Sequence, residues 1–304
     1  MSKKSKFLIL IFIALSVVTC NKKDPQKEET ILKGSVTILV DETLTPVMED
    51  QVAVFESYYD AKIKLDSKSE VEVLNDLINK KTGIAILTRK LSSQELKIFE
   101  QKKIKPRITP FANDAIAFIA NKNNNDTLIA LKDVIDFMKG MPNLSIKGLV
   151  FDNPNSSTVR YMNTLAGLKA IPQKGIYSFK TNEEVIKFVA QNDGMVGVVG
   201  VNWLSQPSPK MQEYVDKVNV LGVKGTTSTN FYTPSQNNIA EGKYPLARDL
   251  YIINCQGYSG LGMGFASFVA GDIGQRIILK SGLLPIRIPG RRLSIRKEII
   301  NEKK

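Results

Sequence analysis

The chain has 304 residues, of which 42 are Lys or Arg, 30 are Asp or Glu and none is His. Without histidine, Ser-His-Asp and Cys-His nucleophiles, His-ligated zinc and histidine acid-base catalysis are excluded. The two cysteines, Cys20 and Cys255, make no Cys-x-x-Cys pair and no disulfide framework. We therefore expect no metal and no cofactor, and no catalysis that depends on histidine. The length fits one large domain or two lobes.

The N-terminus has the pattern of an export signal. Lys3, Lys4 and Lys6 precede an apolar stretch, residues 7–18, that is interrupted only by Ser16. This stretch is short for a membrane span and typical of a signal peptide. It ends at Val17-Val18-Thr19-Cys20, which resembles a bacterial lipobox. We predict a signal peptide at 1–20, a lipidated Cys20 and a flexible tether at 21–30, so that the protein is exported and anchored at the cell envelope, facing the periplasm or on the cell surface. A short membrane anchor that stays attached is the alternative.

Strand and helix patterns then alternate along the chain. In the first part we expect strands at 35–40 and 84–87, and helices that begin at Pro46, Glu70 and, with Ser92 and Glu95 as a capping box, at about residue 93. Two strands, 105–109 and 115–120, follow, separated by Pro110 and Asn113-Asp114.

The second part repeats the alternation. Helices are expected at 128–138, after Ser156-Ser157-Thr158, and after Thr181, with strands at 149–151, 195–199 and 250–254. Residues 218–233 are irregular and polar, and one last amphipathic helix is expected over 265–277. This order predicts an α/β fold with mainly parallel sheets.

The net charge does not indicate a polyanion partner. Seven of the basic residues lie from Arg287 onward, and we interpret 291–304 as a solvated basic tail. No basic-aromatic patch is present in the body of the chain, so we expect no nucleic-acid partner.

Three segments share one design, in which a strand ends, hydroxyl residues follow and a helix starts. They are Thr43-Leu44-Thr45-Pro46, Leu87-Thr88-Arg89 and Ser156-Ser157-Thr158. A helix N-terminus presents free N–H groups and a positive dipole end, so each segment can hold an anion. The alternative is that these residues only cap helices.

Other candidate sites are weaker. The glycines between Gly257 and Gly264 lack dinucleotide-loop spacing and indicate a flexible or close-packed loop. Cys255 and Trp203 are interpreted as packing residues. The acidic pairs are interpreted as solvated surface: Asp41-Glu42, Glu49-Asp50 and Glu183-Glu184.

Together with the lipobox and the three anion-capable segments, four phrases resemble the phosphate-binding lipoproteins of bacterial phosphate ABC transporters. The phrases are residues 84–91, 155–160, 244–251 and 274–277. The resemblance implies a type II periplasmic-binding-protein fold with two α/β lobes around a hinged cleft, which captures phosphate or a similar oxyanion and delivers it to an ABC permease. It also implies that the protein is not an enzyme. We place one lobe at 31–112 and 225–290 and the other at 113–224.

The sequence departs from this family at two charged positions. Members commonly carry an Arg where this chain has Asp152 and a Gly where it has Ser157, and some carry an Asp where it has Arg89. We expect Arg89 to neutralise the oxyanion and Asp152 to accept its proton, with Arg160 as a substitute cation and Arg248 bracing the lobes. The remaining ligands are expected to be the hydroxyls and amides of Thr43, Thr45, Thr88, Ser156, Ser157 and Thr158.

Other functions stay open. One is a surface interaction lipoprotein that keeps the fold but does not bind phosphate. Another is a Ser/Lys hydrolase, although no Ser-x-x-Lys stands at a predicted helix start. A third is the same cleft tuned to another oxyanion or to a small organic anion.

Overall fold

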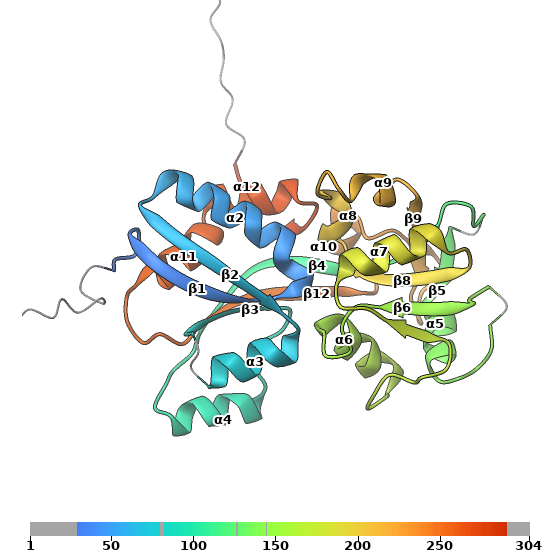
Figure 1. The fold of residues 1–304 in the computed structure, drawn as a ribbon, viewed down its shortest axis with the longest axis horizontal. Coiled ribbons are helices and arrows are strands. Elements are labelled where there is room, and N and C mark those ends of the chain that lie inside the picture. The colour runs from blue at the N-terminus through green and yellow to red at the C-terminus, as the bar shows by residue number, and fades with distance from the viewer. Residues whose placement is uncertain (1–28, 80–81, 126, 144, 291–304) are drawn as a thin grey trace, which may run out of the picture.

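The computed structural model describes residues 29–290 except 80–81, 126 and 144. The predicted signal peptide, Cys20, most of the tether and the tail at 291–304 lie outside the described residues. Figure 1 shows two α/β halves side by side, with β4 and β12 running through the middle. In the part of the chain that is described, no helix is both long enough and apolar enough to cross a membrane.

The first half contains a sheet with helices on both faces. Its strands are β2 (Ala61–Lys68), β1 (Gly34–Asp41) and β3 (Ile84–Leu87), which are mutually parallel, followed by β12 (Ala247–Asn254), which is antiparallel. Helices α2 (Thr45–Tyr58), α11 (Leu261–Val269) and α12 (Asp272–Lys280) share one core. Helices α3 (Glu70–Ile78) and α4 (Ser93–Gln101) share the other, in which Leu77 and Phe99 are fully buried. The strand ends therefore lie between two helix layers.

The second half repeats this plan. Strands β8 (Met195–Gly200), β6 (Gly148–Phe151) and β7 (Ile176–Ser178) extend the sheet, and β9 (Val218–Val220) pairs with β4. A smaller sheet joins β5 (Leu128–Ala130), β10 (Gly222–Lys224) and β11 (Phe231–Tyr232). The helices are α5 (Leu131–Met138), α6 (Ser157–Ala166), α7 (Asn182–Gln191), α8 (Asn202–Ser205), α9 (Gln212–Val215) and α10 (Gln236–Ala240).

One strand joins the halves. β4 (Arg107–Asn121) pairs with β12 and β13 (Leu284–Pro285) at its start and with β8 and β9 at its end. The prediction of two strands separated at Pro110 is therefore wrong. The ladder with β12 shifts register between Leu250 and Tyr251, which leaves Phe111 without a direct partner. A bulge tolerates a residue without an N–H group, so Pro110 fits here without ending the strand.

The other expectations mostly hold, with local differences. Residues 128–138 begin as β5 before the helix, and the expected last helix is two helices, α11 and α12. The edge strand β2 and the short strands within 218–233 were not predicted. Ile239, Tyr244 and Leu246, which we placed in the first lobe, pack in the core of the second half. The chain therefore returns to the first half closer to Ala247 than to residue 225.

The glycine-rich segment, which was predicted to be a loop, continues into α11 at Gly262 and Gly264 and is packed closely against the N-terminal segment. The Glu29 carboxylate accepts hydrogen bonds from Leu261 N (2.7 Å) and from the Tyr258 hydroxyl (3.2 Å). A Cβ at Gly264 would collide with the carbonyl oxygen of Ile31. The start of the described chain is thus attached to the first half.

Candidate functional site

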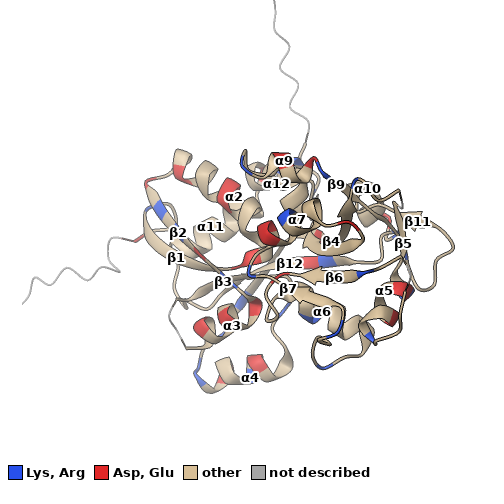
Figure 2. Cartoon of the chain, turned by 45° about the vertical axis from the view of Figure 1, so that its right-hand side comes forward, with Lys and Arg blue, Asp and Glu red and all other residues tan. Residues whose placement is uncertain are grey.

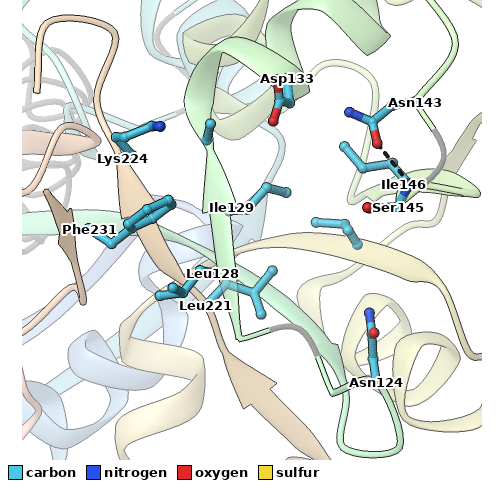
Figure 3. Close-up of a pocket in the computed structure, with 12 residues that line it drawn as sticks. Asn124, Leu128, Ile129, Asp133, Asn143, Ser145, Ile146, Leu221, Lys224 and Phe231 are labelled. Atoms are coloured by element: carbon cyan, nitrogen blue, oxygen red, sulfur yellow. Dashed lines mark hydrogen bonds between the residues drawn. The ribbon is translucent and has the colours of Figure 1, made fainter. Parts of the chain in front are cut away.

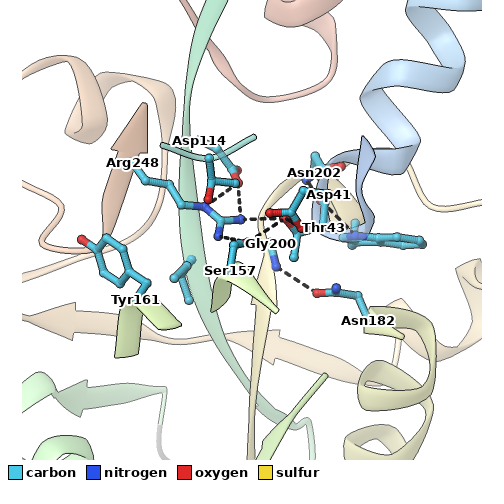
Figure 4. A network of polar contacts seen from close by, with 12 residues as sticks. Asp41, Thr43, Asp114, Ser157, Tyr161, Asn182, Gly200, Asn202 and Arg248 are labelled. Carbon is cyan, nitrogen blue, oxygen red and sulfur yellow. Dashed lines mark hydrogen bonds and ion pairs between the residues drawn. The ribbon is translucent and has the colours of Figure 1, made fainter. Parts of the chain in front are cut away.

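A buried arginine lies where the two halves meet. Arg248 stands on β12, its side chain is 2% exposed, and its Nη2 lies 2.8 Å from Asp114 Oδ2 on β4. Its Nη1 donates to Ser157 Oγ (3.1 Å) and its Nη2 to Thr43 Oγ1 (3.3 Å), as Figure 4 shows. One guanidinium therefore contacts the 3-10 helix η2 (Glu42–Leu44) of the first half and the start of α6 in the second. We call Asp41, Thr43, Asp114, Ser157 and Arg248 the Arg248 cluster.

The halves touch directly within this cluster. Thr43 Oγ1 lies 3.3 Å from Ser157 Oγ, and it donates to Asp41 Oδ1 at 3.0 Å. The carbonyl oxygen of Thr43 accepts hydrogen bonds from Asn202 Nδ2 (2.7 Å) and Trp203 Nε1 (3.1 Å) of the second half. Asp41 caps η2 through Thr43 N (3.1 Å), which fixes this turn. The two halves are therefore closed against each other at this contact.

A second polar bridge lies beside the cluster. Asn182 Nδ2, at the start of α7, donates to Glu42 Oε2 (2.6 Å) and to Asp152 Oδ2 (3.2 Å). Asn182 N donates to Glu42 Oε1 (3.2 Å), and Asn182 Oδ1 accepts from Gly200 N (3.1 Å). Ser156 Oγ donates to Asp152 Oδ1 at 2.5 Å. We call Glu42, Asp152 and Asn182 the acidic latch.

Carboxyl groups outnumber cations in this region. Asp41, Asp114 and Asp152 are fully buried and Glu42 is half-buried, whereas the Arg248 cluster contains one cation, Arg248 itself. Although burial lowers the pKa of the Arg248 guanidinium, Asp114 and Asp41 raise it, and the net shift is upward. Arg248 therefore stays charged at every physiological pH.

The same surroundings raise the pKa of the acids. Burial, followed by the charge of Glu70, raises the pKa of Asp41 to about 6. Burial raises the pKa of Asp152 to about 7, and Asp41 adds to the shift. Burial and the neighbouring Asp152 raise the pKa of Glu42 to about 8. Some of these carboxyls hold protons near neutral pH and can then donate hydrogen bonds.

The other predicted charges gather around Glu70. Its carboxylate is buried, and Oε1 accepts from Arg89 Nε (2.9 Å) and Arg160 Nε (2.7 Å). Arg89 also pairs with Glu95. Thr88 Oγ1 lies 3.5 Å from both Glu70 Oε2 and Arg160 Nη2. Thr88, Arg89 and Arg160 of this group line, together with Arg248, one open cavity of about 450 Å³, which runs along the boundary between the halves.

Thr45 lies apart from both groups. Its hydroxyl donates to Ser67 Oγ (2.9 Å), and it lines a separate cavity with Glu49, Asp50 and Trp203. A further cavity, of about 340 Å³, lies in the second half between Ile129 and Phe231 (Figure 3). It is lined by none of the residues that the sequence singled out.

Some polar atoms near the Arg248 cluster have no protein partner. Among the described residues, Thr158 Oγ1, Asp41 Oδ2 and Asp114 Oδ1 are buried without a hydrogen bond. Buried polar groups are normally paired, so these atoms can serve a bound polar molecule. Across the described ranges, no group of three or more Cys, Asp or Glu side chains is placed to hold a metal ion. The chemistry here is hydrogen bonding and charge neutralisation by one guanidinium.

The structure distributes the predicted site residues over distinct groups. Thr43 and Ser157 join the Arg248 cluster, Asp152 and Ser156 join the acidic latch, and Thr88, Arg89 and Arg160 surround Glu70. Thr158 is buried at the first turn of α6. Arg89 is paired with two carboxylates, and the cation that contacts Thr43 and Ser157 is Arg248.

Sequence reasoning missed several residues of the site. The interpretation of Asp41-Glu42 as solvated surface is wrong, because Asp41 is fully buried. Their position directly after an apolar strand was the available signal. No signal in the sequence marked Asp114, Asn182 and Asn202, because only the fold brings them to the boundary between the halves.

In the view of Figure 2, acidic and basic residues are interspersed over the helices.

Comparisons with known proteins agree with this architecture. The family model of the PBP superfamily domain matches residues 25–272. The phosphate-binding protein PstS of Borreliella burgdorferi is 24% identical over 300 residues, which cover 93% of this chain and 99% of that protein. PstS of Pseudomonas aeruginosa is 20% identical over 281 residues, which cover 84% of each chain.

A solved structure gives the same picture. The structure of a putative phosphate ABC transporter substrate-binding protein from Clostridium perfringens, with bound phosphate, aligns with a TM-score of 0.69 and 20% identity. The alignment covers 84% of this chain and all of that one. The predicted α/β binding-protein fold is thereby confirmed, and the chain belongs to the PBP superfamily.

Proposed function

We propose that this protein binds phosphate or a similar oxyanion between its two halves and delivers it to an ABC permease. The observation that carries the proposal is Arg248, a buried cation that donates hydrogen bonds to hydroxyls of both halves. A cation flanked by hydroxyl donors and a helix N-terminus is suited to an oxyanion. The relatives named as phosphate-binding proteins support the same ligand.

The binding step is closure of the halves. Residues 31–112 with about 247–290 would form one moving body, and 113–246 the other. Contacts such as that of Thr43 with Ser157 form only when the two bodies meet. A ligand that contacts both bodies favours the closed arrangement, which a membrane permease can then recognise.

Specific residues take the binding roles in this proposal. Arg248 supplies the charge, and Thr43, Ser157 and Thr158 supply hydroxyls, with Thr45, Thr88 and Ser156 kept as residues to test. Asp152 accepts the proton of a protonated oxyanion when it is itself ionised. Arg89 and Arg160, which line the same cavity as Arg248, add positive potential at its entrance.

Lipid attachment at Cys20 belongs to the same proposal. The apolar stretch before Cys20 and the lipobox support it. A lipid-anchored protein outside the cytoplasm would stay close to its permease.

The test is a melting experiment on the chain without residues 1–20, which keeps every described residue. Ligand at a hundred times its dissociation constant adds about 2.7 kcal/mol of stability, or about 5–10 °C for a chain of this size. We expect phosphate to raise the melting temperature more than sulfate or molybdate does, each measured against chloride at the same ionic strength. No response to any oxyanion at 10 mM or so, which is saturating for a dissociation constant of about 0.1 mM, would contradict the proposal.

A surface lipoprotein with the same fold but no phosphate binding is the second candidate. The observation that favours it is the excess of carboxyl groups around Arg248, together with Asp152 at the place where the family commonly has an Arg. Unprotonated carboxylates repel an oxyanion. The melting experiment separates the two candidates.

A further inference from the structure

The acidic latch places two carboxyl groups on one amide across the boundary between the halves. Glu42 belongs to η2 in the first half, whereas Asp152 follows β6 and Asn182 begins α7 in the second. Asn182 Nδ2 donates to both carboxyls, at 2.6 Å and 3.2 Å. Asn182 and Asp152 are fully buried, and Glu42 is half-buried.

This arrangement does not neutralise two negative charges. The amide of Asn182 is uncharged, and Ser156 contributes one more neutral donor, to Asp152 Oδ1. Two ionised carboxyls at such a site repel each other, and one of them then retains a proton. We propose that Glu42, Asp152 and Asn182 hold the halves together by sharing a proton, so that closing takes up a proton and opening releases it.

The charged groups that face the latch come from several elements. Asp41, at the end of β1, acts on both acids and favours their protonated forms. Arg248 on β12 opposes this at Asp152, although its own closest partner is Asp114 on β4. Glu70 on α3 acts on Asp41 and is itself paired with Arg89 and Arg160. The net surroundings of the latch therefore remain acidic.

The direction of the pH effect follows from the raised pKa values. Unfolded carboxyls titrate near pH 4, whereas Asp152 titrates at about 7 and Glu42 at about 8 in the folded chain. The folded, closed form binds more protons than the unfolded or open form between these limits. Its stability is therefore greatest at low pH within this range and is lost as the pH rises to about 8.

The acidic latch depends on contact between the two halves and not on the identity of the ligand. The proposal for the acidic latch can be tested independently of phosphate binding, because its experiment needs no ligand. If phosphate does bind, release of the proton at a basic pH would also loosen the ligand.

The experiment compares the wild-type chain without residues 1–20 with Glu42→Gln. Urea unfolding is measured at several pH values from 5.5 to 8.5, and small-angle scattering is recorded at both ends of this range. One proton changes the unfolding equilibrium about tenfold per pH unit. We expect the wild type to lose stability steadily from pH 5.5 to about 8 and to expand at pH 8.5. Glu42→Gln is expected to lack about one tenfold step per pH unit of this slope and to stay compact.

Two further variants make the result decisive. Glu213→Gln, at an exposed position on α9, is the matched control and is expected to keep the wild-type slope. Asp152→Asn removes the other acid and is expected to move the slope to lower pH, and it decides the matter if Glu42→Gln does not fold. A wild-type slope in the folded latch variants would overturn the proposal.

Discussion

Replacing Arg248 with methionine is expected to lower the free energy of unfolding by about 3–5 kcal/mol. The reason is the side chain that is left behind. Asp114 is fully buried, Arg248 is its ion-pair partner, and Asp114 Oδ1 already lacks a hydrogen bond. Methionine fills much of the volume but leaves the Asp114 carboxyl without a cation. An uncompensated buried charge is the main reason why breaking a buried ion pair lowers stability.

Urea unfolding followed by circular dichroism measures this loss. Arg276→Met is the matched control, because Arg276 makes an exposed i,i+4 pair with Asp272 and should cost less than about 1 kcal/mol. Adding Asp114→Leu to Arg248→Met is expected to restore part of the stability, since it removes the unpaired acid. An Arg248→Met variant as stable as the Arg276→Met control would show that Arg248 does not organise the boundary.

Ser157→Phe is expected to hold the halves apart. Ser157 is fully buried at the start of α6, and its hydroxyl lies 3.3 Å from Thr43 Oγ1 of the other half. A phenyl ring cannot fit in this contact without displacing η2. Overpacking of this kind costs about 1–3 kcal/mol, which corresponds to about a five- to 150-fold loss of the closed form and of oxyanion affinity.

Small-angle scattering and titration calorimetry with phosphate measure the two effects. Ser157→Ala is the control, because it removes the hydroxyl that bonds Arg248 but adds no bulk. We expect Ser157→Ala to stay as compact as the wild type and Ser157→Phe to have a larger radius of gyration. Equal compactness of the two variants would argue against closure at this contact.

Much of the fold could be predicted from local patterns. The apolar runs of β1, β3, β6 and β8 and the capping box of Ser92 with Glu95 are strong local signals, and the structure confirms them. The edge strand β2 was missed because lysines alternate with its apolar residues and most of its side chains remain partly exposed. β4 was divided in two because the bulge that accommodates Pro110 depends on β12, which is more than 130 residues away along the chain.

The site was predicted only in part, for a related reason. Thr43, Ser156 and Ser157 follow strand ends, a local pattern that the sequence displays. Arg248 becomes central only because β12 lies between β3 and β4, which places it opposite α6 and η2. Arg89, by contrast, has an acidic partner six residues away in Glu95 and a second in Glu70, and these pairings occupy its guanidinium.

The attachment of Glu29 to α11 bears on how the protein would meet the permease proposed above. Nine peptide units separate Cys20 from Glu29, and a fully extended chain of that length spans about 30 Å. With Cys20 lipidated as proposed, this short linker would keep the attached end of the binding domain within about 30 Å of the bilayer surface. Confinement of that kind would keep the binding domain close to any permease embedded in the same membrane, so that the two would meet by diffusion along the bilayer.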